Sequence, residues 1–474
     1  MSSSKNLITW FPNYIKNRLK QLLIFPKKPI DIMFCYVDHF EPEWNDADES
    51  KEQERLKRWD KYYPILSKKH KDSDGICPQH TWFYPAERRL ENLDIISSWC
   101  FNGLGDLELH LHHGNDTSET LQKKMSGYLT RFNDYGALLT ATDPPETKYA
   151  FIHGNWALDN SAGDPTLCGV NDEISILSDT GCYADLTMPS LGPSQASKVN
   201  AIYYVKDDPY FPKSYNTGVD VTVGGSQYGD LMMITGPIGI NWKDWHHWFY
   251  PAVENSDIST NRLPSDDRVR LWVKTGIHVK KKPEWIFVKV HTHGTIEKDF
   301  DTVLGESADR MHSTLEKEFN DGSNYRLHYV TARECYNIIK AAEAGKTGNP
   351  CDYRDFIIPP YVCNVLKYNP GMQLIYYRKD GFKIKTDKVI NMEIQTRKFS
   401  LQKISGSGKG IEYFEDKDML KFRLDSVKSG SSIQLWFGNI QSLEPDETNR
   451  EITLKDGVMV FKTIDDQWFS FRKV

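Results

Sequence analysis

Several sequence patterns are missing, and each absence excludes a class of protein. The eight cysteines are widely spaced and form no CxxC pair, which argues against a disulfide scaffold and against a cysteine zinc finger. There is no GxxxxGKS/T loop for nucleotide phosphates and no GxSxG elbow for a serine esterase. An excess of basic residues is also missing. The formal net charge of -6 argues against a general nucleic-acid partner.

Acidic residues are absent from the first thirty positions, which contain six lysines or arginines. Apolar residues recur there at helical spacing: Tyr14, Ile15, Leu19, Leu22 and Leu23. Lys16 and Lys20 occupy the opposite side. We therefore expect residues 1–29 to form a basic amphipathic helix that opens at Pro12 and ends near Pro26.

The apolar side of this segment has two interpretations, which the sequence does not separate. It packs against the rest of the chain, or residues 10–25 make a peripheral contact with an anionic membrane surface. No secretory signal is expected, because charges interrupt the apolar run and no small-residue cleavage site follows. No run of eighteen or more apolar residues occurs, so no membrane span is expected. These features predict a cytoplasmic protein, with the inner face of the cell membrane as a place of contact.

From residue 30 to residue 358, strand-like runs alternate with helix-like segments. Strands are expected within 32–42, 80–85, 106–116, 148–157, 181–189 and 285–294. Helices are expected within 49–71, 87–99, 117–132, 173–179 and 333–344. Residues 190–284, rich in Gly, Pro, Trp and Asp, allow no assignment. Strand and helix alternation predicts an α/β domain with a mainly parallel sheet, closed into a barrel.

The pattern of the sequence changes near residue 360, from alternating strands and helices to short strand-like runs. Pro359 and Pro360 indicate a linker, and residues 364–474 contain many short alternating runs separated by Asp, Gly, Ser and Asn turns. This pattern predicts a C-terminal antiparallel β-sandwich or barrel. Its aromatic residues Tyr413, Trp436 and Trp468 could bind glycan, but core or interface packing is the preferred interpretation.

Three of the expected strands end in clusters of histidine, and two of these clusters contain carboxylates. They are YVDHFEP at the end of 32–42, HLHHGND at the end of 106–116 and VHTHG at the end of 285–294. The carboxyl ends of strands are where barrels and open parallel sheets build their sites. Imidazole and carboxylate are ligands of zinc-like divalent ions. The recurrence favours one metal or acid/base site over an accidental cluster of loop histidines.

In order along the chain, these segments resemble the motifs of the polysaccharide deacetylase (NodB-like, carbohydrate esterase) family. YVDHFEP is similar to the first motif, GLGDLELHLHHGND to the second, FIHGNWAL to the third, GCYADLTMP to the fourth and FVKVHTHG to the fifth, while HTWFYPAE is similar to the strand after the first. The resemblance covers about residues 30–340. It implies a distorted (β/α) TIM-type barrel and a metal-dependent enzyme that removes acetyl groups from N-acetylated sugars.

The resemblance also implies roles for the residues of the first two motifs. Asp38 takes the position of the general base, and His39 stands where a metal-binding aspartate is usual. His112 fits the first histidine of the second motif, with Asp116 four residues on in place of a second histidine. His39, His112 and Asp116 would then bind a divalent metal, zinc first, with cobalt, nickel or manganese as alternatives.

Some assignments at these motifs stay open. His110 shares a strand face with His112 while His113 points away, so either could ligate metal or orient a ligand from behind. Glu41 is a spare carboxylate, for which a turn role before Pro42 is preferred.

The later motifs supply the remaining expected site residues. His291 would donate a proton to the leaving amine, with His293 as its substitute or as a neighbouring ligand. Asp185 would orient the acid histidine. His153 replaces the arginine of the third motif, unless it only bonds backbone at a strand end. Trp156 would stack on a sugar face, unless it is core.

The predicted function is therefore hydrolysis of an acetyl group from an N-acetylated saccharide or sugar precursor in surface polysaccharide metabolism. His110, His113, His153, Trp156 and Asp185 are expected around the substrate. Two alternatives remain. One is another C–N hydrolase, such as an allantoinase-like amidohydrolase, on the same barrel. The other is a catalytically lapsed barrel that binds glycan.

Overall fold

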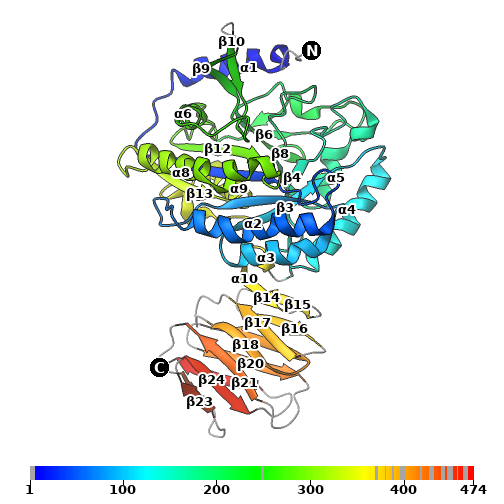
Figure 1. Cartoon of the computed structure of the whole chain (residues 1–474), viewed down its shortest axis with the longest axis vertical. Helices are drawn as coiled ribbons and strands as arrows, with labels where there is room; N and C mark the ends of the chain where they lie inside the picture. The colour runs from blue at the N-terminus through cyan, green and yellow to red at the C-terminus, as the bar shows by residue number, and fades with distance from the viewer. Residues whose placement is uncertain are drawn as a thin grey trace. The chain divides into compact units, whose positions relative to one another are not determined.

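The structure is a computed structural model, and it divides into two compact units: residues 1–132 with 148–358, and residues 133–147 with 359–474. It describes residues 6–142, 144–246, 250–368, 372–378, 381–386, 389–394, 401–416, 419–425, 432–438, 443–445, 452–455, 457–462 and 468–473. Each unit is described below by itself (Figure 1).

A large mixed sheet forms the centre of the first unit. Its strands are β1 (Ile30–His39), β2 (His80–Pro85), β3 (Gly105–Leu111), β4 (Tyr149–His153), β5 (Cys182–Asp185), β6 (Ala201–Val205), β7 (Val219–Asp220), β8 (Leu231–Thr235), β11 (Asp257–Ile258), β12 (Trp285–Thr292) and β13 (Tyr325–Val330). The order is β11-β12-β1-β2-β3-β4-β5-β8-β6-β7, with β13 also paired to β1. Neighbours are parallel from β11 to β8, and only β6 and β7 are antiparallel.

The mainly parallel sheet predicted from the sequence is confirmed. In the described residues, the edge strands β7 and β11 do not pair with each other, so closure into a barrel is not observed. The unassigned region 190–284 holds β6 to β11, including a separate hairpin of β9 (Gly239–His246) and β10 (Tyr250–Glu254).

β1 organises this sheet. One of its edges pairs with β12 from Asp31 to Asp38. The other edge is shared, because β13 pairs with residues 30–35 and β2 pairs with residues 36–39. The polar carboxyl ends of β1, β2 and β12 therefore lie side by side.

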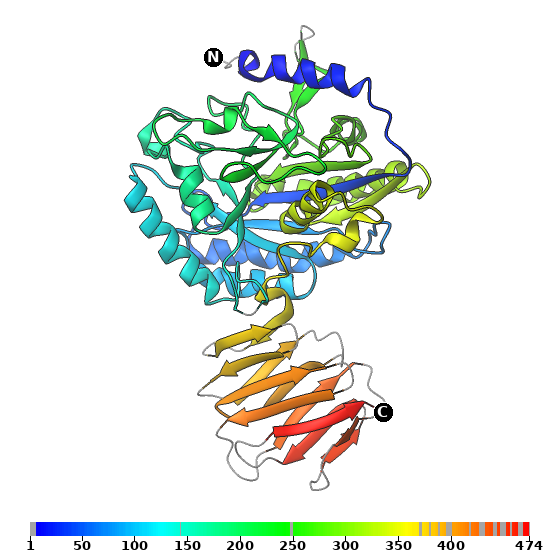
Figure 2. The ribbon, with the colours of Figure 1, turned by 180° about the vertical axis from the view of Figure 1, so that it is seen from behind.

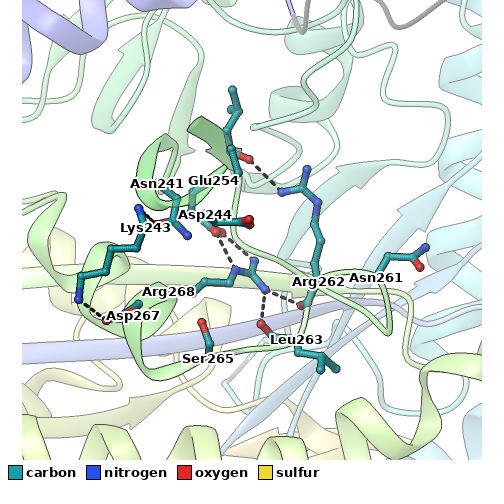
Figure 3. Close-up of a pocket in the computed structure, with 12 residues that line it drawn as sticks. Asn241, Lys243, Asp244, Glu254, Asn261, Arg262, Leu263, Ser265, Asp267 and Arg268 are labelled. Carbon is teal, nitrogen blue, oxygen red and sulfur yellow. Dashed lines mark hydrogen bonds and ion pairs between the residues drawn. The ribbon is translucent and has the colours of Figure 1, made fainter. Parts of the chain in front are cut away.

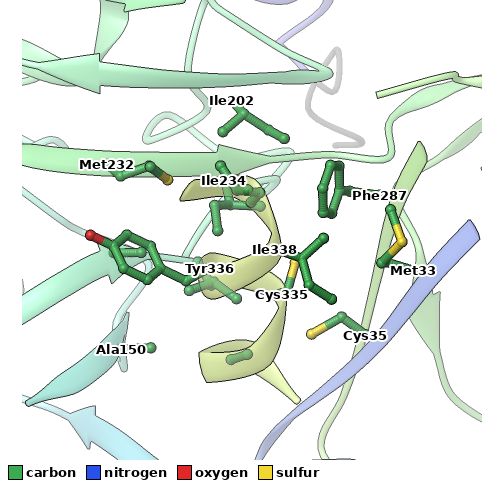
Figure 4. Packing of buried hydrophobic residues seen from close by; sticks show 14 of the residues in the cluster. Met33, Cys35, Ala150, Ile202, Met232, Ile234, Phe287, Cys335, Tyr336 and Ile338 are labelled. Atoms are coloured by element: carbon green, nitrogen blue, oxygen red, sulfur yellow. The ribbon is translucent and has the colours of Figure 1, made fainter. Parts of the chain in front are cut away.

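Helices cover both faces of β1. Met33, Cys35 and Val37 belong to the core that includes α9 (Ala332–Glu343), whereas Phe34 lies against His312 of α8 (Glu306–Phe319). Figure 4 shows Cys335, Tyr336 and Ile338 of α9 among side chains of the surrounding strands. Burial of both faces explains why β1 is a continuous apolar run and not an alternating one.

Four of the other helices of this unit overlap the predicted segments: α2 (Glu49–Ser67), α3 (Leu93–Phe101), α4 (Ser118–Asn133) and α5 (Glu173–Asp179). The sequence does not predict α6 (Asp266–Lys274) and α7 (Phe300–Leu304). The Asp48 side chain caps α2 by accepting from Lys51 N at 2.9 Å. Leu56, Trp59, Tyr63 and Leu66 of α2 are buried, as their spacing predicts.

The N-terminal helix lies earlier in the chain than expected, and it ends at Gln21, five residues before Pro26. α1 (Leu7–Gln21) begins five residues before Pro12, which lies inside the helix and does not open it. Trp10 and Tyr14 are buried in a small core with Ile238 and Val253. None of the described helices is both long and apolar enough to cross a membrane.

The second unit consists of two antiparallel six-stranded sheets. One has the order β14-β17-β18-β21-β24-β23 and the other β15-β16-β19-β20-β25-β22. The strands are β14 (Leu366–Tyr368), β15 (Gln373–Arg378), β16 (Gly381–Lys385), β17 (Val389–Ile394), β18 (Leu401–Ser407), β19 (Gly410–Glu415), β20 (Met419–Asp425), β21 (Ser432–Phe437), β22 (Leu443–Pro445), β23 (Ile452–Lys455), β24 (Val458–Lys462) and β25 (Trp468–Lys473), preceded by the one-turn helix α10 (Val362–Val365). Both sheets contribute to one hydrophobic core, for example Ile404 from the first and Phe422 from the second. The antiparallel β-rich nature predicted for this region is confirmed.

Residues 133–147 also belong to the second unit. Leu139 and Ala141 pack against its core. Their backbone groups bond to the chain after residue 359: Val362 N donates to Leu139 O and Ala141 N donates to Pro360 O, both at 2.8 Å.

Candidate metal centre

The carboxyl ends of β1 and β3 bring three metal-ligating side chains together. His39 ends β1, Glu41 follows it, and His110 lies near the end of β3. All three are buried, and their ligand atoms lie within 4.8 Å of one another. We call these residues the His39 group. Two of its members, His39 and His110, are among the predicted site residues.

Hydrogen bonds fix the His110 ring so that one nitrogen is available to a cation. Its Nδ1–H donates to the Ile152 carbonyl at 2.9 Å, which leaves the lone pair on Nε2. Nε2 is 3.5 Å from Glu41 Oε1 and is buried without a hydrogen-bond partner in the described chain. Two ligands bound to one zinc ion at a tetrahedral angle stand roughly 3.3 Å apart. The nitrogen and the carboxylate therefore fit a shared metal.

His112 lies at the edge of this group. Its Nδ1 bonds to Glu87 Oε1 at 2.7 Å, and its Nε2 is 3.7 Å from Glu41 Oε2. A carboxylate behind an imidazole is the usual way in which proteins orient a metal-site histidine. Gly154 permits the arrangement, because a Cβ there would overlap the His112 ring.

His39 is held between two rings. Trp156 stacks on it at 4.8 Å between ring centroids and His293 at 4.6 Å, and His39 Nδ1 has no hydrogen-bond partner among the described residues. Burial, reinforced by the neighbouring imidazoles, lowers the pKa of His39 well below its usual value. A neutral imidazole with an unsatisfied buried nitrogen is suited to bind a metal ion.

Glu41 carries the negative charge of the group. Burial opposes its ionisation, but the neighbouring imidazoles, His110 first, bring the pKa of the Glu41 carboxyl below its usual value. It is therefore ionised at neutral pH.

Asp38 does not join this group. Neighbouring side chains on a strand point to opposite faces, and Asp38 turns away from His39. Its Oδ2 is 3.0 Å from His80 Nε2, and its Oδ1 accepts from Gly294 N at 2.7 Å. Both oxygens thus hold β2 and the turn after β12, and the role of Asp38 as general base stays a prediction.

The two histidines of β12 differ in their surroundings. His291 is buried, lies edge-on to Trp156 at 5.6 Å, and has a pKa lowered well below its usual value by burial and by nearby Lys289. His293 is partly exposed and touches His39 and Trp44. His293 is therefore the one of the pair that water can reach.

Asp116 and His113 belong to a second group with His153, Cys168 and Glu173. His113 Nδ1 is 3.2 Å from Asp116 Oδ2, and its Nε2 is 3.1 Å from Glu173 Oε1. Burial opposes protonation, but the two carboxylates raise the pKa of His113. A protonated ring with both nitrogens bonded has no lone pair for a metal.

His153 is also unsuited as a ligand. Its Nδ1 accepts from Asn155 N at 3.1 Å, so in the neutral ring the proton is on Nε2, which faces Glu173 at 3.7 Å. Burial lowers the pKa of His153 to about 3 and keeps the ring neutral. This second group is thus a hydrogen-bonded ion-pair cluster, and the predicted ligand Asp116 is not brought to His39 and His112.

A third group of donors consists of Asp74, His328 and Cys351. His328 belongs to β13 and contacts Asp31 near the amino end of β1. His328 Nδ1 is 2.8 Å from Asp74 Oδ2, and its Nε2 is 3.0 Å from Asp31 Oδ1. Burial opposes the charge, but these two carboxylates raise the pKa of His328 to about 11. This imidazolium also lacks a free lone pair. His153 Nε2 in the second group also lacks a hydrogen-bond partner, but it carries the proton of its ring. In the His39 group, by contrast, the unpartnered Nε2 of His110 keeps its lone pair and lies beside a carboxylate.

Two other predicted site residues have structural partners. Asp185 is buried and accepts from Thr187 N at 3.0 Å and from Thr187 Oγ1 at 2.7 Å, and no hydrogen bond of the described residues joins it to His291. Burial raises the pKa of Asp185 and lowers that of neighbouring Lys289. Trp156 adopts a left-handed backbone conformation with φ of 56° and uses one ring face to cover His39.

A polar cavity of about 350 Å³ adjoins the segment that leads to β11 (Figure 3). Its lining includes Lys243, Glu254, Arg262 and Arg268. Arg268 binds Glu254 through two hydrogen bonds of 2.6 and 2.7 Å. None of the lining residues belongs to the His39 group, although Ser256, two residues beyond Glu254, accepts from His291 N at 3.1 Å.

Three residues near the site were not predicted to belong to it: Glu41, Glu87 and Lys289. Glu41 was expected to serve a turn, yet it lies between two imidazole nitrogens. Glu87 follows the end of β2, and the logic that polar residues at strand ends form the site would have identified it. Lys289 is a charge inside an apolar strand two residues before His291, which is also a recognisable signal.

Comparisons with known proteins do not assign this chain to a family. No protein-family model and no curated protein matches the sequence. A similar solved structure is the crystal structure of a Parabacteroides distasonis protein proposed to be a glycoside hydrolase/deacetylase. It is 9% identical, the match covers 86% of this chain and 85% of that one, and the TM-score is 0.37. These values are too low to carry an inference about activity or residue roles.

Proposed function

We propose that the chain is a metal-dependent hydrolase that removes an acetyl group from an N-acetylated sugar. The observation that carries the proposal is the position of Glu41 beside His110 Nε2 and His112 Nε2, at 3.5 and 3.7 Å, with the other nitrogen of each ring already bonded. The sugar substrate follows from the resemblance of the motifs to polysaccharide deacetylases.

Residues of the His39 group would bind the metal, with zinc as the first candidate. His39, Glu41 and His110 supply two imidazoles and a carboxylate, a set that leaves coordination positions open. When bound, such an ion lowers the pKa of a bound water and polarises the acyl oxygen.

The other residues of the site would position substrate and move protons. His112 and His293 are the partly exposed imidazoles beside the group, and they connect it to solvent for transfer of a proton to the leaving amine. Partly exposed Trp156 and buried His291 lie beside His39, with ring centroids 4.8 and 6.4 Å from that of His39. Glu87 orients His112.

Metal analysis of three purified proteins tests the centre: wild type, His110→Ala and His113→Ala. Wild type and His113→Ala should each contain about one equivalent of divalent metal, because His113 is bonded to carboxylates on both nitrogens. His110→Ala should lose it. Equal metal content in all three, or none in the wild type after reconstitution, contradicts the assignment.

Release of acetate then tests the reaction. Wild type should release acetate from N-acetylated oligosaccharides and His110→Ala should not. A metal-loaded wild type that releases no acetate but opens cyclic amides would favour the allantoinase-like alternative. Retained glycan binding without turnover would favour the lapsed barrel.

A further inference from the structure

The outward side of α1 and the turn after it form an exposed apolar surface. The exposed fractions are 91% for Ile8, 60% for Leu19, 67% for Leu22, 80% for Leu23 and 88% for Phe25. Phe11 and Ile15 lie between them on the same side and are also exposed. Spacings of three and four residues place Ile8, Phe11, Ile15 and Leu19 in one stripe along the helix, and Leu22, Leu23 and Phe25 follow beyond its end at Gln21.

The opposite side of α1 is already packed, so the stripe is not a core surface awaiting a partner within this unit. Trp10 and Tyr14 are buried with Val199 and Ile238. Asn17 Nδ2 donates to Val199 O and Arg18 Nη1 donates to Lys274 O, both at 2.9 Å. These contacts fix the rotation of the helix about its axis and hold the stripe outward.

Charge distinguishes this surface from the rest of the chain. Residues 1–30 contain six cations and no acid, whereas the whole chain has a net charge of -6. Lys16 and Lys20 lie exposed beside the stripe, and Lys27 and Lys28 follow it. Long lysine side chains can reach an anionic surface while apolar neighbours are buried.

Two exposed tryptophans lie on the hairpin beside α1. Trp242 and Trp245 of β9 are 66% and 50% exposed. The base of β9 contacts the helix, since Ile240 N donates to the Tyr14 hydroxyl at 3.4 Å. Figures 1 and 2 show the β9–β10 hairpin next to α1 from both sides. Tryptophan is enriched where protein meets the headgroup region of a bilayer.

We propose that α1, with residues 22–25 and the β9 tryptophans, docks the protein on the surface of an anionic lipid bilayer. The helix lies in the interface plane, with Ile8, Leu19 and Leu23 among the acyl chains and the lysines at the phosphates. A second copy of the chain fits this surface less well than an anionic bilayer does. A twofold interface through this surface would place the same cationic segment against itself.

Vesicle co-sedimentation tests the docking. The full chain is mixed with vesicles of equimolar phosphatidylglycerol and phosphatidylcholine, or of phosphatidylcholine alone. Wild type should bind the anionic vesicles, and high salt, with a screening length of about 3 Å, should weaken binding. Ile8→Gln/Leu19→Gln/Leu23→Gln and Lys16→Glu/Lys20→Glu should each bind about tenfold more weakly or worse.

Matched variants separate docking from general effects. Ile65→Gln/Leu263→Gln removes exposed apolar side chains elsewhere, and Lys57→Glu/Lys68→Glu makes the same change in net charge in α2 and at the residue after it. Both should bind like the wild type. Every substituted side chain is exposed, so circular dichroism and the melting temperature should be unchanged.

Three results would overturn the proposal. They are no binding of wild type to anionic vesicles, equal loss of binding in the control variants, and a wild-type dimer that the α1 variants convert to monomer without any vesicle binding. The test needs no metal and no substrate, so its outcome is independent of the proposed hydrolase.

Discussion

Hydrogen bonds to individual histidine nitrogens decide which donor groups can serve a metal. His110 has its Nδ1 proton committed to a carbonyl and keeps a lone pair, whereas His113 and His328 are bonded to carboxylates on both sides. In all three places a histidine lies beside at least one carboxylate. A sequence shows the types but not the partner of each nitrogen, and Glu173 is sixty residues away from His113.

Replacement of His328 tests its role as a charge-paired residue. His328→Gln should lower the free energy of unfolding at pH 7 by about 3 kcal/mol, because Asp31 and Asp74 lose a buried cationic partner. The stabilisation by His328 is fully present below the unfolded pKa near 6.5 and is lost as pH rises through about 11. Urea unfolding at pH 7 and 10 measures it. Metal content should be that of the wild type, and a loss of metal would contradict the assignment.

Burial of Asp159 has the opposite result to that of His328, because it keeps the Asp159 side chain uncharged. Burial, reinforced by Asp207, raises the pKa of Asp159 to about 8, although Ser214 N donates to its Oδ2 at 2.6 Å. The native state then keeps a proton that the unfolded chain loses above about pH 4, so the stability falls as pH rises from about 4 to 8. Asp159→Asn removes this trend.

Melting temperatures at pH 5 and pH 8 check the prediction for Asp159. The advantage of Asp159→Asn over wild type should be larger at pH 8. Asp208→Asn is the control, because its side chain is exposed. An advantage of equal size at both pH values would show that Asp159 does not titrate in this range.

At the scale of elements, the sequence predicts what depends on local pattern. The strands β1, β3 and β12 are predicted because each is a buried run followed by polar residues, and α2 because its apolar spacing is helical. The hairpin of β9 and β10 is not predicted, since GINWKDWH does not alternate regularly. The start of α1 is misplaced because Pro12 is a start signal that tertiary packing of Trp10 overrides.

The capping box of α9 gives a test at this scale. Thr331 accepts from Glu334 N, Glu334 bonds back to Thr331 N, and the Thr331 hydroxyl donates to Asp106 at 2.5 Å. Thr331→Ala should lower the free energy of unfolding by about 1 to 2 kcal/mol. Thr331→Ser keeps both bonds and should cost much less. If urea unfolding shows that Thr331→Ala and Thr331→Ser lower the free energy of unfolding equally, the loss comes from the methyl group and not from the hydrogen bonds.

At the scale of the whole molecule, metal binding and stability should be linked. A ligand that binds only the folded state stabilises it by about 2.7 kcal/mol at one hundred times its dissociation constant. Chelation should therefore lower the melting temperature of the wild type and leave that of His110→Ala unchanged. The same drop in both proteins would mean that the chelator acts elsewhere or that the His39 group holds no metal.

The second unit is built from two segments that are far apart in the sequence, and this affects synthesis of the chain. Residues 133–147 emerge from the ribosome before the rest of their own unit, which begins at residue 359. Roughly two hundred residues lie between, and at about 5–20 residues per second they take some 10 to 40 seconds to make. During that interval Leu139 and Ala141 lack the core that later covers them. A nascent chain must keep this short apolar segment from other partners until the last quarter of translation.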